Sequence, residues 1–246
     1  MYYRFPEKLR EGIIKARPNR FIMLVKIGGK IEECHCPSTG RIGSIHFQDI
    51  PCLVSKSRNP SRRTRFTVEA ISLDSPRKKS KSWIGVNQTA ANDYFFFFLK
   101  RGAFGKMVGG GEHALRERKI GRSRIDFEIG DEALVELKTM LMDLPCEAHP
   151  QYREHVAPFV SFHRLVKHFG ELAKALASEK KKRALIVLCY LYDAKPFTVP
   201  VLDSKTAEIT RAARAAARAG VENWQVNFVI NGEGVRLKRF FKLELF

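Results

Sequence analysis

Two short runs of alternating apolar and polar residues, separated by a turn, constrain the fold of this chain more than any other stretch. The first run is RIDFEI (124–129) and the second is ALVELK (133–138). Side chains of a strand alternate between two faces, so a hairpin would gather Asp126, Glu136 and Lys138 on one face. Two carboxylates and a lysine can hold a hard divalent cation and position a water beside it. A solvated hairpin face with a surface ion pair is the alternative interpretation.

The length of 246 residues and the hydrophobic share of 44% indicate a globular protein of one large or two ordinary domains. The longest apolar run, YFFFFL (94–99), is too short to span a bilayer. The first residues lack the apolar core of a signal peptide, so a cytoplasmic protein without membrane partners is expected. Five cysteines without a secretory signal make a disulfide framework unexpected. A zinc site at Cys34-His35-Cys36 is disfavoured, because His35 would point away from both cysteines in a strand.

The formal net charge is +18, and the first third of the chain is the most basic part per residue. The positive electrostatic potential of such a chain attracts polyanions, and nucleic acid is the first candidate. Charge alone does not distinguish DNA from RNA or anionic lipid as the partner.

Short strand-like segments with polar turns between them fill residues 20 to 73. They run over 20–36, with a turn at Gly28-Gly29, over 50–57 and over 63–73. This pattern predicts a small OB-like barrel, which commonly binds nucleic acid. Arg58, Arg62, Arg63 and Arg65, close to Phe66, would form a platform for phosphates and bases; a solvated strand face is the alternative.

The basic run 75–83 is predicted to link the barrel (1–82) to a second domain (83–246). Asn87 would cap a helix over 90–102 whose four phenylalanines are buried, and Gly102 would end it. The other predicted elements are helices over 159–176 and 204–219, and strands over 184–192, 223–230 and 235–245. The order hairpin, helix, strand, helix, strand predicts a small α/β sheet domain.

Several segments together resemble one family. They are CPSTGR (36–41), NPSRRTRFT (59–67), WIGVN (83–87) with Asn92 beyond it, GRSRIDF (121–127), VELK (135–138) and AGVE (219–222). In this order they resemble the sugar fermentation stimulation protein A (SfsA) family over nearly the whole chain. The resemblance implies an α/β (α+β) chain: an N-terminal OB-like β-barrel followed by a mixed-sheet domain similar to the PD-(D/E)XK nucleases. It also implies largely sequence-nonspecific DNA binding and a link to sugar-utilisation genes.

The resemblance also assigns site residues. Asp126 matches the first acid of the nuclease motif, Glu136 and Lys138 match its E-x-K, and Glu117 would be a further acid ligand. Mg²⁺ or Mn²⁺ would be the cofactor. The residues expected to contact nucleic acid are Arg41, Arg58, Arg62, Arg63, Arg65, Arg122, Arg124, Arg164 and Lys167.

The chain departs from the family pattern in three places. Ile125 replaces the motif's proline, Ser38 stands where asparagine is usual, and the segment 142–158 diverges, although an R-x-x-K-H pattern follows at 164–168. Two functions stay open: DNA binding through phosphates, and a Mg²⁺- or Mn²⁺-dependent DNA nuclease using Asp126, Glu136 and Lys138. RNA binding is a third interpretation. The sequence does not distinguish single-stranded from double-stranded DNA as the partner. A homodimer is also compatible with the sequence.

Overall fold

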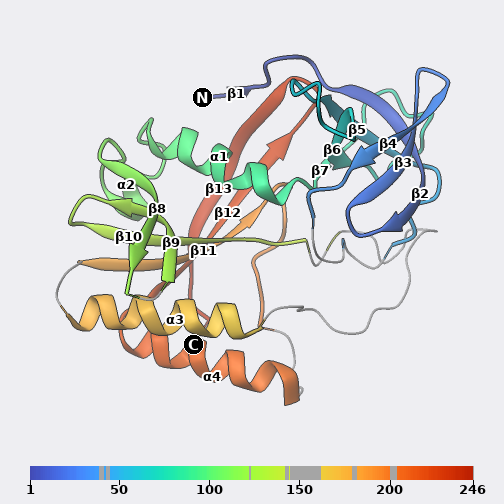
Figure 1. The fold of residues 1–246 in the computed structure, drawn as a ribbon. Helices are drawn as coiled ribbons and strands as arrows, with labels where there is room; N and C mark the ends of the chain where they lie inside the picture. The colour runs from blue at the N-terminus through green and yellow to red at the C-terminus, as the bar shows by residue number, and fades with distance from the viewer. Residues whose placement is uncertain are drawn as a thin grey trace.

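The computed structural model describes residues 1–38, 42, 45–121, 123–141, 144, 162–178, 182–199 and 204–245. It contains two sheets, a six-stranded one that curls into a barrel and a seven-stranded one flanked by helices (Figure 1). The predicted α/β class with an OB-like barrel is confirmed.

The barrel is built from one Greek-key set of strands: β2 (Arg10–Asn19), β3 (Ile22–Ile27), β4 (Lys30–His35), β5 (Ile50–Lys56), β6 (Phe66–Ile71) and the short β7 (Ile84–Gly85). The strand order is β4-β3-β2-β5-β6-β7, and a parallel pairing of β4 with β6 closes the barrel. This is the strand order of an OB-fold. The predicted turn is present, because Gly28 and Gly29 adopt φ values of +54° and +89°. β2 was not among the predicted strands.

The second sheet runs β1-β13-β12-β11-β10-β9-β8. Its strands are β1 (Tyr3–Arg4), β8 (Ala114–Ile120), β9 (Ser123–Ile129), β10 (Ala133–Thr139), β11 (Arg183–Tyr190), β12 (Glu222–Ile230) and β13 (Gly234–Leu243). The central strands β10, β11 and β12 are parallel, and the outer pairs are antiparallel. The sheet is therefore mixed, as predicted.

Helices cover both faces of this sheet (Figure 1). They are α1 (Gln88–Leu99), α2 (Gly105–Val108), α3 (Phe162–Ala177) and α4 (Ser204–Arg218). Alternate residues of β11 divide between the faces: Ile186 packs in the core that includes α3 and α4, and Val187 packs in the core that includes α1 and α2. No helix of the described residues combines the length and apolarity needed to cross a membrane.

Helix α1 begins where the sequence indicates. The Asn87 side chain accepts a hydrogen bond from the backbone N–H of Ala90 at 3.1 Å. Of the four phenylalanines, Phe95 and Phe98 are fully buried, whereas Phe96 and Phe97 are half-buried. The helix ends at Leu99, three residues before Gly102, because the chain has already entered a turn there.

The two sheets exchange short strands across the expected boundary at residue 82. β1 lies in the N-terminal part of the chain but pairs with β13, with Tyr3 opposite Val235. β7 follows residue 82 and pairs with β6 of the barrel. The Gly85 N–H also donates to the carbonyl of Leu191 at 2.9 Å, so this strand touches both domains.

Candidate metal centre and nucleic-acid surface

The β9–β10 hairpin brings the two motif acids together. Phe127 lies opposite Val135 in an antiparallel register, so Asp126 and Glu136 project from neighbouring positions of one face. Asp126 is held at both oxygens. Its Oδ2 accepts a hydrogen bond from the Leu137 N–H at 2.8 Å, and its Oδ1 accepts one from Asn92 Nδ2 of α1 at 3.0 Å.

Glu136 is 2% exposed, and its two oxygens have different surroundings. Oε1 accepts a hydrogen bond from Lys138 Nζ at 2.5 Å and contacts His168 Nδ1 of α3. An ionised carboxylate only accepts, so Nδ1 carries the proton in this contact. Lys138 Nζ also lies 3.3 Å from His168 Nδ1. Oε2 is buried and has no hydrogen-bond partner.

The surroundings move the pKa values of the two acids in opposite directions. Burial, and next the neighbouring Glu136 charge, raise the pKa of Asp126 above its ordinary value. Burial would also raise the pKa of Glu136, but the hydrogen bond from His168 and the charge of Lys138 outweigh it, so that pKa is lowered. Paired carboxylates in a partly dry site commonly separate in this way.

The donor set fits a hard divalent cation. A buried carboxylate oxygen without a partner is costly, and a cation bound at Glu136 Oε2 would satisfy it. The adjacent Asp126 supplies a second oxygen donor. Within the described part of the chain no group of three His, Cys, Asp or Glu residues is placed to hold a metal. Mg²⁺ is usually bound by one or two carboxylates and keeps several waters, so two acids suffice.

Glu117, the expected further acid, points elsewhere. It lies in β8 with φ +52°, and its carboxylate accepts a hydrogen bond from Arg124 at 3.0 Å. Both side chains are mostly exposed. Asp126, Glu136 and Lys138 therefore share one face of the hairpin, whereas Glu117 is paired with Arg124.

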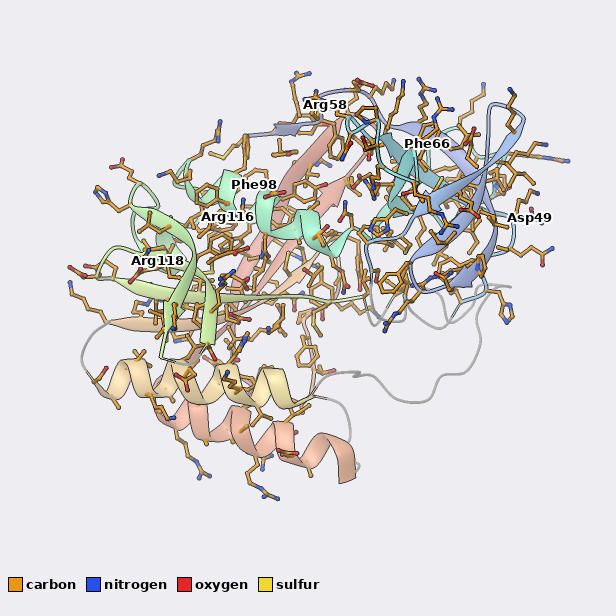
Figure 2. All side chains as sticks on the ribbon, viewed as in Figure 1. Asp49, Arg58, Phe66, Phe98, Arg116 and Arg118 are labelled. Carbon is orange, nitrogen blue, oxygen red and sulfur yellow. The ribbon has the colours of Figure 1, made fainter. Side chains whose placement is uncertain are left out.

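The expected nucleic-acid contacts fall into several groups. Arg58 and Arg65 are exposed on the loop between β5 and β6 of the barrel (Arg58 is labelled in Figure 2), but Phe66 is 5% exposed and packs in the core, so it cannot serve as the expected base platform. In the same loop Arg62 donates to Thr67 Oγ1 at 3.0 Å, and Arg63 lies 3.6 Å from Glu33.

Of the remaining expected contacts, Arg124 is exposed on β9 of the second sheet. Lys167 is exposed on α3. Arg41 and Arg122 lie outside the described residues, as does the side chain of Arg164 in α3.

Asn92 and His168 contact the acids although sequence reasoning did not place them in the site. They lie on helices before and after the hairpin, so the alternation of β9 and β10 carries no information about them. The R-x-x-K-H pattern at 164–168 was the one available signal for His168. The barrel also approaches this end of β10: Gln88 Nε2 donates to the Thr139 carbonyl at 3.3 Å, and Ser38 Oγ donates to Gln88 Oε1 at 3.4 Å.

Comparison with known proteins agrees with this architecture. The model of the SfsA N-terminal OB domain matches residues 16–86, and that of the sugar fermentation stimulation protein RE domain matches residues 89–234. A sugar fermentation stimulation protein homolog of Syntrophobacter fumaroxidans is 29% identical over 97% of this chain and 86% of its own length. A sugar fermentation stimulation protein homolog of Natranaerobius thermophilus is 27% identical over 96% of this chain and 94% of its own length.

A solved structure has the same fold. It is described as Pyrococcus furiosus SfsA in complex with Ca²⁺, and it aligns with a TM-score of 0.73 at 20% identity, covering 100% of this chain and 99% of that one.

Proposed function

Since this chain belongs to the sugar fermentation stimulation protein family, we propose that it binds DNA, chiefly through phosphate contacts. The observation that carries the proposal is the arginine-rich loop of residues 57–65 on an OB-like barrel. OB-folds bind nucleic acids with the loop between their fourth and fifth strands, and residues 57–65 occupy that position between β5 and β6. A role in regulating sugar metabolism is the wider proposal that the family name supports.

Phosphate contacts predict a steep dependence of affinity on salt and little dependence on sequence. Replacing Arg58 and Arg65 by alanine should lower the slope of log K against log salt by about 0.7–0.9 for each phosphate that the variant no longer neutralises. Lys182→Ala is the matched control, because Lys182 is exposed but pairs with Glu132 at the start of β11. Binding that ignores salt, or that selects one sequence strongly, would contradict the proposal.

Metal-dependent phosphodiester hydrolysis is the second candidate, and the unpartnered Oε2 of Glu136 favours it. Asp126 and Glu136 would hold Mg²⁺ or Mn²⁺; the Ca²⁺ of the related structure is also a hard, oxygen-preferring ion. A bound cation of this kind supplies Lewis acidity and a water of lowered pKa. Asn92 and the Leu137 N–H orient Asp126. Lys138 would orient the attacking water and stabilise charge developing on the phosphate.

Cleavage assays with single-stranded, double-stranded and branched DNA test this candidate in Mg²⁺ and in Mn²⁺. Asp126→Asn, Glu136→Gln and Lys138→Ala should each abolish cleavage while DNA binding persists. Glu117→Gln tests whether this acid takes part, because its described partner is Arg124. Cleavage that survives these substitutions would show that the assignment of Asp126, Glu136 and Lys138 as catalytic residues is wrong.

A further inference from the structure

The turn between β2 and β3 exposes an aromatic ring. Phe21 is 40% exposed, and among the described residues no other aromatic side chain falls in the exposed class. A single exposed apolar side chain is ordinary on a protein surface. The residues around this ring therefore decide whether it can contribute to binding.

The backbone beneath the ring is fixed by local hydrogen bonds. Asn19 Oδ1 accepts from the N–H groups of Phe21 and Ile22 at 2.9 and 3.0 Å. The Phe21 carbonyl accepts from the Cys36 N–H at 2.7 Å, and Arg17 Nη2 donates to the Arg20 carbonyl at 3.0 Å. A ring held on such a turn would lose little conformational entropy on binding a planar partner.

An arginine stacks on the ring, and an arginine-rich loop lies at the same end of the barrel. The Arg20 guanidinium carbon lies 4.6 Å from the Phe21 centroid, so a delocalised cation already stacks there. Strand register brings the arginine-rich loop to the same end of the barrel: Ile22 pairs with His35, and His35 pairs with Thr67 just after that loop. The hydrogen bond from Arg62 to Thr67 fixes one guanidinium there.

The exposed ring and the arginine-rich loop lie where OB-folds bind their ligands. By strand order, the 19–21 turn and the 57–65 loop are the loops between the first and second and between the fourth and fifth OB strands. OB-folds bind oligonucleotides there, and unpaired bases stack on aromatic rings while cations contact the backbone. Bases inside a duplex are already stacked, so their faces are hidden from such a ring.

We propose that this end of the barrel binds unpaired DNA, with one base stacked on Phe21 and phosphates on the arginines of the 57–65 loop. The inference rests on the proposed DNA binding and specifies the form of DNA. It assigns separate roles to two kinds of residue: the arginines contribute to binding any DNA, and Phe21 contributes only where a base is free.

The test is fluorescence anisotropy with the full chain, using a labelled single strand of about 16 nucleotides and the matching duplex. Phe21→Ala should weaken single-strand binding about 5- to 150-fold, the equivalent of removing one stacked base, and change duplex binding less than about twofold. Phe21→Trp should bind near the wild-type level, and single-stranded DNA should quench its added emission. Ile31→Ala is the matched control, because Ile31 is 62% exposed on β4 of the same barrel.

The possible results distinguish a failure of base stacking on Phe21 from a failure of the proposed DNA binding. If Phe21→Ala binds single strands as the wild type does, or weakens single strand and duplex equally, the stacking role is wrong while DNA binding stands. If the wild type binds neither form, the proposed DNA binding fails, and the inference fails with it. Thermal unfolding followed by circular dichroism should match the wild type for each variant, because the replaced side chains are exposed.

Discussion

His168 offers the sharpest test of the candidate metal centre. It is 4% exposed, and its Nδ1 contacts the Oε1 of Glu136 that also binds Lys138. With Oε1 occupied by two donors, Oε2 is the oxygen left for a cation. His168 therefore acts as a positioning residue that fixes the orientation of the carboxylate, and its removal should weaken metal binding without removing a ligand.

Two substitutions separate the hydrogen bond from the packing. His168→Leu fills a similar volume but has no donor, whereas His168→Asn places an amide N–H near the position of Nδ1. Loss of such an orienting partner typically costs 10–100-fold in metal affinity, or about 1.4–2.7 kcal/mol. The leucine variant should show this loss, and the asparagine variant should remain within a few-fold of the wild type.

Electron paramagnetic resonance of Mn²⁺ measures the affinity without DNA and without catalysis. His46→Leu is the control, because His46 is an exposed histidine of the barrel domain. Urea unfolding should show a cost of about 1–3 kcal/mol for the leucine variant, since a buried acceptor loses one donor. Wild-type affinity in His168→Leu, or equal loss in both variants, would refute the positioning role. Absence of Mn²⁺ binding by the wild type would refute the metal centre itself.

Three further predictions, one of them with a control substitution, concern the site and its junction with the barrel. Asn92→Leu removes the α1 donor to the first acid and should lower Mn²⁺ affinity in the same resonance titration, again by about 10–100-fold. Gly85→Ala would place a Cβ 2.5 Å from Leu191 Cβ, so urea unfolding should show a loss of about 1–3 kcal/mol, whereas Gly105→Ala, with nothing within 4 Å, should lose less. Burial raises the pKa of Glu69, so the stability it contributes is present below its ordinary pKa and is lost as pH rises through the raised one. The wild type should therefore lose unfolding free energy as pH rises above the ordinary pKa of a glutamate, and Glu69→Gln should lose less.

Local patterns predicted the β9–β10 hairpin well. The β9–β10 hairpin follows from alternation with period two, and that period alone puts the motif acids and Lys138 on one face. The start of α1 is also predicted from nearby residues, because Asn87 can cap the first turn of the helix. Each prediction needed only residues within a few positions of one another.

Other features of the fold were not predicted, because they depend on pairing between strands far apart in the sequence or on irregular backbone within a strand. β2 was not predicted because Gly12 and Pro18 interrupt its pattern. Gly12 keeps a regular register with β5, whereas the register with β3 shifts between Ala16 and Asn19, around Pro18. The pairing of β1 with β13 joins the two ends of the chain, which no periodicity reveals. Glu117 has a positive φ, a backbone conformation that the alternation of a regular strand does not predict.

The barrel and the metal centre are connected through α1. Glu69 of β6 accepts a hydrogen bond from Asn87 Nδ2 at 2.7 Å, and the Oδ1 of the same amide caps α1. One turn further along, Asn92 donates to Asp126. A buried barrel residue is thus joined to the first acid of the hairpin by two asparagines on one short helix. The buried phenylalanines of α1 pack against Phe127 and Phe228 of the sheet domain, so the helix and Asn92 are held there. The bond from Asn87 to Glu69 ties the start of the same helix to the barrel, so the barrel and the sheet domain constitute one structural unit around this site.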